Sequence, residues 1–315
     1  MHHRSLGRSG IAVPSIVFGG NVFGWTLDKA ASHRILDRLV EVGLNAIDTA
    51  DMYSTWVPGN QGGESEAIIG EWMAARGNRG KVKVFTKVGM KMGSGDEGLS
   101  REWILKEADA SLKRLKTDVI DLYQAHRDDP NTPMEETLGA FAELIKAGKV
   151  RAIGASNYTA PRLKAALDTS AKLGLPRYET LQPHYNLMER EGFEAELGPL
   201  CASEGLGVIN YYALASGFLS GKYRSAADFG KSARGGGMAK YLTPRGHAVL
   251  GALDVIAAEV SATPAQVALA WLLAKPVISA PIASATTDAQ VDDLVKAASL
   301  ALPPDAVAQL DAASA

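Results

Sequence analysis

Short, mostly apolar runs recur along the chain, and each is followed by a longer amphipathic stretch that ends in glycine or in a polar turn. This alternation is typical of strands and helices that follow one another in a parallel sheet. Several runs are apolar on both faces, as strands covered by helices must be. The eight runs are residues 15–19, 44–47, 82–86, 119–125, 151–155, 178–182, 207–211 and 277–282. We predict an α/β protein, a (β/α)8 TIM barrel with extra helices and an N-terminal β-hairpin.

The predicted helices carry start and stop signals. Residues 132–135 and 263–266 each match a capping box with a proline at the first helical position. Glycine takes the left-handed conformation that ends a helix without steric cost, so glycines mark the expected helix ends. These glycines are Gly43, Gly148, Gly174 and Gly205.

Residues 224–243 form the longest stretch without such a pattern, and they contain Gly230 and the glycine run 235–237. Their small and basic residues predict a mobile loop. The loops that follow barrel strands build the active site, so we favour a lid over a surface insertion without function.

Composition narrows the functions that such a fold can serve. The chain has 315 residues, of which 46% are hydrophobic, so it can bury one large core, and we expect a single domain spanning residues 1–315. A formal net charge of -2 provides no field that favours nucleic acid or a membrane surface. No run approaches the roughly 20 apolar residues of a membrane span, and Cys201 is the only cysteine. We expect a cytoplasmic protein that binds a small molecule; the oligomeric state leaves no readable pattern. His2 and His3 are expected at the surface, and we predict no metal site.

A literal G-x-G-x-x-G motif occurs at Gly93, Gly95 and Gly98, with Asp118 about 20 residues further on, as in a dinucleotide-binding Rossmann fold. Its context does not fit that fold. Residues 87–92 separate the first glycine from the preceding run, and Asp118 precedes the next run rather than ending it. We therefore interpret the motif as part of a flexible loop.

Polar residues end three successive predicted strands. Asp48, Lys87 and His126 follow the second, third and fourth apolar runs, and Tyr53 follows Asp48 in the same loop. Each of them alone is as easily explained by a structural role. Because the carboxyl ends of neighbouring barrel strands face one site, the three endings together indicate catalysis.

Carbonyl reduction would explain this combination, since it needs hydride at carbon and a proton at oxygen. A phenol with an ordinary pKa of about 10 donates poorly at neutral pH, and a nearby ammonium should lower that pKa. We therefore predict Tyr53 as the general acid and Lys87 as the ammonium. Asp48 would keep Lys87 charged, and His126 would orient the substrate oxygen.

These residues resemble the aspartate, tyrosine, lysine and histidine motifs of aldo-keto reductases, in the same order. The likeness covers nearly the whole chain and implies reduction of an aldehyde or ketone to an alcohol with hydride from NADPH, or from NADH. Its segments are 6–10, 19–21, 48–53 (Asp-Thr-Ala-Asp-Met-Tyr), 85–87 (Phe-Thr-Lys), 121–126 (Asp-Leu-Tyr-Gln-Ala-His), 148–157 and 263–271.

The resemblance also implies how the cofactor is held. Ser156, Asn157 and Gln182 would bind the nicotinamide carboxamide, and Tyr211 would stack on the ring and orient its hydride. Alternatively, Ser156 and Asn157 cap the following helix. The small-residue stretch 213–217 would approach the pyrophosphate. The N-terminus of the helix that begins within residues 283–290 would face the adenosine phosphate. The further residues implied in cofactor binding are Gly20, Asn21, Leu214, Ser216, Gly217, Ser284, Ala285, Thr286 and Gln290.

The sequence indicates the substrate-binding residues less specifically than the cofactor-binding residues. Trp25, Trp56, Phe23 and Tyr185 lie in or near βα loops, where they either form an apolar wall for the substrate or simply pack. Arg127 stands where the family often has tryptophan after the histidine, and we predict that it contacts the substrate.

The sequence leaves two questions open. Thr287 stands where many members of the family have a basic residue, so the preference for NADPH over NADH is not fixed. A related barrel could also act as a cofactor-binding regulatory subunit with weak or no turnover. A lyase or phosphate-sugar isomerase barrel is the other alternative, and it would bind no nicotinamide cofactor.

Overall fold

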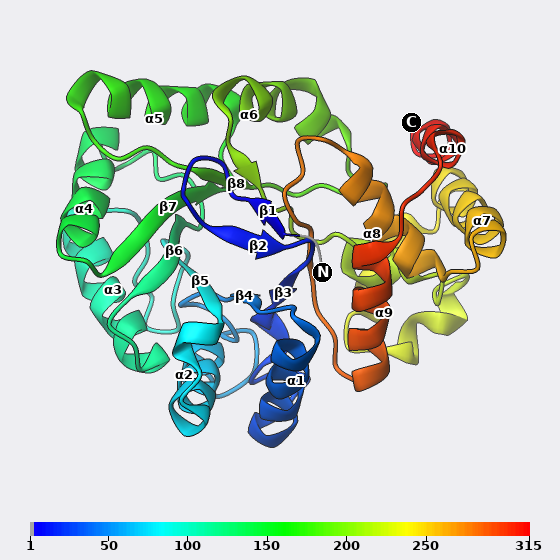
Figure 1. The fold of residues 1–315 in the computed structure, drawn as a ribbon, viewed down its shortest axis with the longest axis horizontal. Helices are drawn as coiled ribbons and strands as arrows, with labels where there is room; N and C mark the ends of the chain where they lie inside the picture. Colours follow the sequence, from blue (N-terminus) through cyan, green and yellow to red (C-terminus); the bar gives the residue numbers. More distant parts are fainter. Residues whose placement is uncertain (1–2) are drawn as a thin grey trace.

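The computed structural model describes residues 3–315 and confirms the predicted barrel (Figure 1). Its eight-stranded parallel sheet has the order β10-β3-β4-β5-β6-β7-β8-β9. The ring closes where Val208 forms a bridge with Ile278 and the Ile282 amide donates to the Asn210 carbonyl oxygen. Each predicted run overlaps one of the strands. These are β3 (Val17–Gly19), β4 (Ala46–Asp48), β5 (Lys83–Val88), β6 (Ile120–Ala125), β7 (Val150–Ser156), β8 (Thr180–Gln182), β9 (Gly207–Val208) and β10 (Ile282–Ala283).

Helices cover the outside of the ring (Figure 1). They are α1 (Lys29–Val42), α2 (Glu64–Arg76), α3 (Arg101–Leu115), α4 (Met134–Lys146), α5 (Ala160–Leu173), α6 (Gly198–Glu204), α7 (Pro244–Glu259), α8 (Pro264–Ala274), α9 (Asp288–Ser299) and α10 (Pro304–Ala313). Two of these helices, α7 and α10, pack against each other at the periphery of the molecule (Figure 1). Of the helices described, none alone is long and apolar enough to cross a membrane; α7 and α8 pass that test only as a pair, across a 94° bend.

The helix ends follow the predicted signals with one exception. The capping box of Thr263 and Gln266 is present, with the expected proline at the start of α8. The box predicted at Thr132 is wrong, because α4 begins after Pro133 without a side-chain cap. The Thr132 hydroxyl instead donates to Asp129 Oδ2 at 2.7 Å, and a carboxylate is the stronger acceptor. The predicted terminal glycines all have left-handed backbones, at Gly43, Gly148, Gly174 and Gly205.

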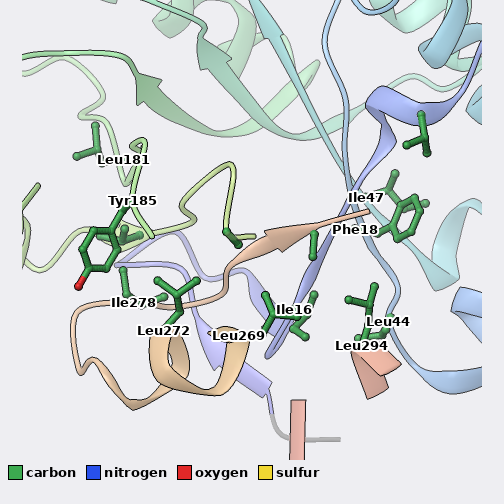
Figure 2. Close-up of a cluster of buried hydrophobic side chains, with 14 of the residues drawn as sticks. Ile16, Phe18, Leu44, Ile47, Leu181, Tyr185, Leu269, Leu272, Ile278 and Leu294 are labelled. Carbon is green, nitrogen blue, oxygen red and sulfur yellow. The ribbon is translucent and has the colours of Figure 1, made fainter. Parts of the chain in front are cut away.

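Alternate residues of each strand face opposite sides of the sheet. The inward residues of successive strands, among them Ala46, Phe85 and Leu122, form one buried cluster inside the barrel. Their outward neighbours pack against the helices in a larger cluster. Figure 2 shows part of this outer layer, with Leu294 of α9 beside Leu44. The alternation therefore decides which side chains enter the barrel.

The predicted N-terminal hairpin is present, formed by β1 (His3–Ser5) and β2 (Ala12–Pro14). His3 is exposed, as expected, and His2 lies outside the described residues. Leu6 joins the buried cluster inside the barrel, and Arg4 donates to carbonyl oxygens that precede β10. A Cβ on Gly7 would overlap the backbone just before β8 and β9. The hairpin thus covers the N-terminal end of the barrel, which leaves the other end for a site.

The segment 224–243 is irregular, as predicted, but it contains two short 3-10 helices, η5 (Ala226–Lys231) and η6 (Gly235–Tyr241). Met238 and Tyr241 of η6 are buried, so part of the segment belongs to the packed body of the protein. Its movement as a lid stays a prediction.

Candidate active site

The alternation along the strands carries polar side chains to the C-terminal end of the barrel interior. Asp48, Lys87 and Gln124 each come two residues after a side chain of the apolar filling. His126 follows Gln124 at the same spacing. Because residues two apart in a strand share a face, these four side chains meet above the apolar filling.

Lys87 is the centre of this group and is fully buried. Its ammonium donates to Asp48 Oδ2 at 2.6 Å and to the Thr49 carbonyl oxygen at 2.7 Å. A third bond, of 3.1 Å, reaches the Tyr53 hydroxyl, so all three donors are used. Burial alone would lower the pKa of Lys87, but the attraction of Asp48 and Tyr53 outweighs it and the pKa is raised. Lys87 therefore stays charged at neutral pH.

Tyr53 lies in the loop after β4, with its ring partly exposed and its hydroxyl against Lys87. Burial raises the pKa of Tyr53, while the Lys87 ammonium lowers it by less. The net pKa is above the ordinary value, which corrects the expectation that Lys87 would bring it down. The cause is desolvation of the phenolate. Tyr53 is accordingly protonated at neutral pH, as a proton donor must be.

His126 directly follows β6 and is 6% exposed. Burial, helped by the charges of Lys87 and Arg127, holds the pKa of His126 well below its usual range. Its ring faces Tyr53 edge-on, with centroids 6.0 Å apart, and its Nδ1 atom has no partner among the described residues. A neutral imidazole beside the phenol can offer a hydrogen bond to a substrate oxygen.

Two buried glutamines bind the Asp48 oxygen that Lys87 leaves free. Gln182 Nε2 donates to Asp48 Oδ1 at 2.9 Å, and Gln124 Nε2 donates to the same oxygen at 3.3 Å. Gln182 Nε2 also lies 3.3 Å from Gln124 Oε1. The sequence reasoning missed Gln124. Its position on β6, two residues before His126, was the signal that would have found it.

The residues predicted at the nicotinamide lie on adjoining strand ends. Ser156 Oγ donates to the Gln182 carbonyl oxygen at 2.9 Å. Asn157 Nδ2 donates to the His126 carbonyl oxygen at 2.8 Å, and its Oδ1 accepts from the Tyr211 hydroxyl at 2.8 Å. With a φ of 55°, Asn157 has a left-handed backbone, which asparagine adopts more readily than most residues other than glycine.

The alternative role of Ser156 and Asn157 as helix caps does not apply. The N-cap of α5 is Thr159, whose hydroxyl accepts from the Arg162 amide. Ser156 and Asn157 are therefore free of a capping duty.

The residues predicted at the adenosine end also gather in one place. Ser284 Oγ lies 2.7 Å from the Gly19 carbonyl oxygen and 2.9 Å from Asn21 Oδ1, so its one proton can be donated to either oxygen. Gln290 Oε1 accepts from the Thr286 amide at 2.7 Å, at the start of α9. Ala285 lies between Ser284 and Thr286, and the contact of Ser284 brings two further predicted cofactor residues, Gly20 and Asn21, next to this group.

Leu214, Ser216 and Gly217 lie at η4 (Ala215–Ser220). The backbone is left-handed at Ser216, with φ 57°, and at Gly217, with φ 102°. The Lys222 ammonium lies 3.5 Å from where a Cβ on Gly217 would stand, and it forms no ion pair within residues 3–315. A partly exposed, left-handed backbone beside a cation that forms no ion pair fits a phosphate ligand. The sequence reasoning missed Lys222.

Two of the predicted substrate residues adjoin the acid. Trp56 packs edge-on against Tyr53, with ring centroids 5.7 Å apart, and Trp25 packs against Trp56 at 5.8 Å. Trp56 is 43% exposed, so this aromatic group borders solvent. It can form an apolar wall beside the reacting atoms.

The other aromatic candidates belong to the core. Phe23 is buried and stacks on Phe18, and Tyr185 is buried against Trp271. Their positions near βα loops suggested a role that their packing rules out. Arg127 forms an ion pair with Glu97 at the surface, so its contact with a substrate stays a prediction.

Comparison with known proteins agrees with the fold and with this set of side chains. The sequence model of the Aldo/keto reductase family matches residues 15–315. The chain is 36% identical to the uncharacterized oxidoreductase YrpG of Bacillus subtilis, covering 96% of this chain and 92% of the relative. It is 35% identical to a putative voltage-gated potassium channel subunit beta of Schizosaccharomyces pombe, covering 93% and 87%. It is 31% identical to the aldo-keto reductase AFTS1 of Alternaria alternata, covering 95% and 88%.

The family match and the relatives that are named as oxidoreductases support an oxidoreductase. The chain belongs to the aldo/keto reductase family.

Proposed function

We propose that the protein reduces an aldehyde or ketone to an alcohol with hydride from NADPH, with Tyr53 as the general acid. One observation carries the proposal. The Tyr53 hydroxyl lies 3.1 Å from the buried Lys87 ammonium, which Asp48 holds at 2.6 Å. A phenol held against a fixed positive charge is suited to giving up its proton at the moment that negative charge develops on a carbonyl oxygen.

The residues present fit a dinucleotide cofactor. Ser156, Asn157 and Gln182 carry hydroxyl and amide groups on the strand ends that also hold Asp48 and His126. Tyr211 offers a ring held by its bond to Asn157. The left-handed backbone at Ser216 and Gly217 would hold the pyrophosphate. When bound, a reduced nicotinamide supplies hydride to the carbonyl carbon.

The side chains of this protein supply the proton and stabilise the charge that its transfer leaves behind. Tyr53 would donate its hydroxyl proton to the carbonyl oxygen as the alcohol forms. Lys87 stabilises the phenolate that remains, and solvent later returns a proton to it. Asp48 keeps Lys87 protonated, and the neutral His126 would orient the substrate oxygen by a hydrogen bond.

A cofactor-consumption screen tests this proposal. Purified protein is mixed with NADPH and with NADH in parallel, over a panel of aldehydes and ketones, and the loss of reduced cofactor is followed. We expect turnover of activated aldehydes, with a rate that Tyr53→Phe removes. Binding of neither cofactor, measured by quenching of tryptophan fluorescence, would reject the proposal.

A cofactor-binding subunit is the second candidate, favoured by the relative named as a channel β subunit. The two candidates differ in turnover and not in binding. A single-turnover experiment with NADPH-loaded protein and an activated aldehyde separates them. Tight binding without oxidation of the cofactor would favour the subunit.

A further inference from the structure

The Tyr211 ring has an aromatic neighbour on one of its faces. His184, just after β8, and Tyr211, just after β9, form an isolated parallel bridge, so their side chains lie next to each other. The imidazole stacks on the phenol ring, with centroids 5.1 Å apart and planes inclined by 16°. Because a ring has two faces, His184 leaves one face of Tyr211 for a ligand.

His184 lies on the side of Tyr211 that is turned toward α10. Its side chain lines a cavity of about 670 Å³, together with Glu189, Arg190 and Asp311 of α10. The tip of Tyr211 reaches in another direction, where its hydroxyl donates to Asn157 at the candidate active site. His184 therefore supports Tyr211 from behind, as seen from that site.

One buried side chain ties the two rings to the same frame. Asn186 Nδ2 donates to the Tyr212 carbonyl oxygen at 2.9 Å and lies 3.4 Å from His184 Nε2. The Tyr211 amide also donates to the Pro183 carbonyl oxygen at 2.9 Å. The loop after β8 thus fixes both the backbone of Tyr211 and the imidazole that covers its ring.

The stacked pair consists of two neutral rings at neutral pH. Burial lowers the pKa of His184, the opposing attraction of Glu189 is smaller, and Lys240 lowers the pKa further. Burial raises the pKa of Tyr211 to about 12. A neutral imidazole can accept a hydrogen bond from the Asn186 amide and adds no charge behind the phenol.

Aromatic pairs often serve only to fill the core, but the burial of this segment assigns that role to another residue. The next side chain, Tyr185, is buried and packs on Trp271. His184 is only half-buried and borders the cavity. Its main aromatic contacts are Tyr211 and Tyr212, so its ring is placed for Tyr211 rather than for the core.

We propose that His184 is a positioning residue that holds the Tyr211 ring in the orientation in which its free face takes the nicotinamide. A ring that is already fixed loses less conformational freedom when the cofactor binds, and it presents the hydride in a constant direction. This inference rests on the proposed reduction and adds a residue behind the predicted nicotinamide site.

The test uses a double-mutant cycle on the two rings. His184→Ala removes the support, whereas His184→Phe keeps a ring, for which the adjoining cavity leaves room. Tyr211→Ala is made alone and together with His184→Ala. His247→Ala, which removes an exposed histidine of α7, is the control. The Kd for NADPH is measured by tryptophan fluorescence, thermal melts check folding, and kcat and KM are measured with an activated aldehyde.

We expect His184→Ala to raise the Kd for NADPH by about three- to tenfold, the factor that loss of an aromatic pair predicts. His184→Phe should restore it to within about twofold. Because His184 acts through Tyr211, the double variant should bind NADPH no more weakly than Tyr211→Ala. The kcat should fall in His184→Ala and recover in His184→Phe, the KM for the aldehyde should stay constant, and His247→Ala should match wild type.

A folded His184→Ala variant with an unchanged Kd for NADPH would overturn the inference. A lower Kd would do the same, since His184 would then occupy the face that the cofactor needs. Failure of His184→Phe to restore binding, or a further loss in the double variant, would show that His184 does not act as a ring behind Tyr211. If wild type binds neither NADPH nor NADH, the proposed reduction itself fails.

Discussion

Gln182 Nε2 lies 2.9 Å from Asp48 Oδ1 inside the barrel. The residue that the family resemblance assigns to the nicotinamide therefore also binds the carboxylate that holds Lys87. Gln124 donates to the same oxygen at 3.3 Å. Two neutral donors orient one oxygen of Asp48 and the ammonium binds the other, so the cofactor side and the acid share one buried network.

Removing Gln124 should disturb the acid and spare the cofactor. We expect Gln124→Leu to lower kcat by about three- to tenfold, because Asp48 loses a donor worth roughly 1 kcal/mol. The Kd for NADPH should not change in this variant. Gln182→Leu, in contrast, should both lower kcat and raise the Kd for NADPH. Steady-state kinetics and fluorescence titration measure the two quantities. Equal loss of cofactor affinity in the two variants would contradict this division of roles.

Tyr53→Phe removes the proton donor with almost no change in shape. We expect kcat for aldehyde reduction to fall by about 10²- to 10⁴-fold, the range for loss of a general acid. Tyr123→Phe is the matched control, because the buried Tyr123 hydroxyl has no partner among the described residues. That variant should keep wild-type activity and stability. Near-normal aldehyde reduction by Tyr53→Phe would show that Tyr53 is not the general acid.

The strands were predictable because a strand covered on both sides leaves an apolar run. The last strand shows the limit of this signal. The run 277–282 is mostly apolar, yet regular pairing is confined to β10, and Ile278 makes only an isolated bridge with Val208. Pro281 has no amide hydrogen to donate to the ladder. How the ring closes depends on contacts between distant parts of the chain, which local pattern does not encode.

The candidate site was likewise predictable from the sequence only in part. Asp48, Lys87 and His126 could be predicted because each is polar and each ends an apolar strand. The raised pKa of Tyr53 could not, since it depends on the side chains that surround Tyr53 only after folding. Burial is a property of the packed structure.

The start of α9 offers a test of cofactor preference. Asp288 occupies the first position of this helix, next to the predicted adenosine residues, and pairs with the exposed Arg34 at 3.8 Å. A carboxylate there would repel a 2′-phosphate, the group that distinguishes NADPH from NADH, if the adenosine end of the cofactor binds as predicted. We expect Asp288→Asn to lower the KM for NADPH by about two- to fivefold with little effect on NADH. Asp292→Asn, which removes an exposed carboxylate one turn later that binds Arg38, is the control. A similar change for both cofactors would show that Asp288 does not face the phosphate.

His126 should make the folded protein sensitive to acid. Burial keeps its pKa well below the usual value, so the folded state resists the proton that the unfolded state accepts near pH 6.5, roughly the ordinary value. Stability is therefore complete above that pH and is lost as the pH falls through it, by up to about 1.4 kcal/mol per pH unit for one proton. We expect His126→Phe to flatten this slope. Urea unfolding of both proteins at neutral and mildly acidic pH measures it, with His247→Gln, which removes an exposed histidine of α7, as the control. An equal slope in wild type and His126→Phe would mean that His126 takes up its proton without unfolding.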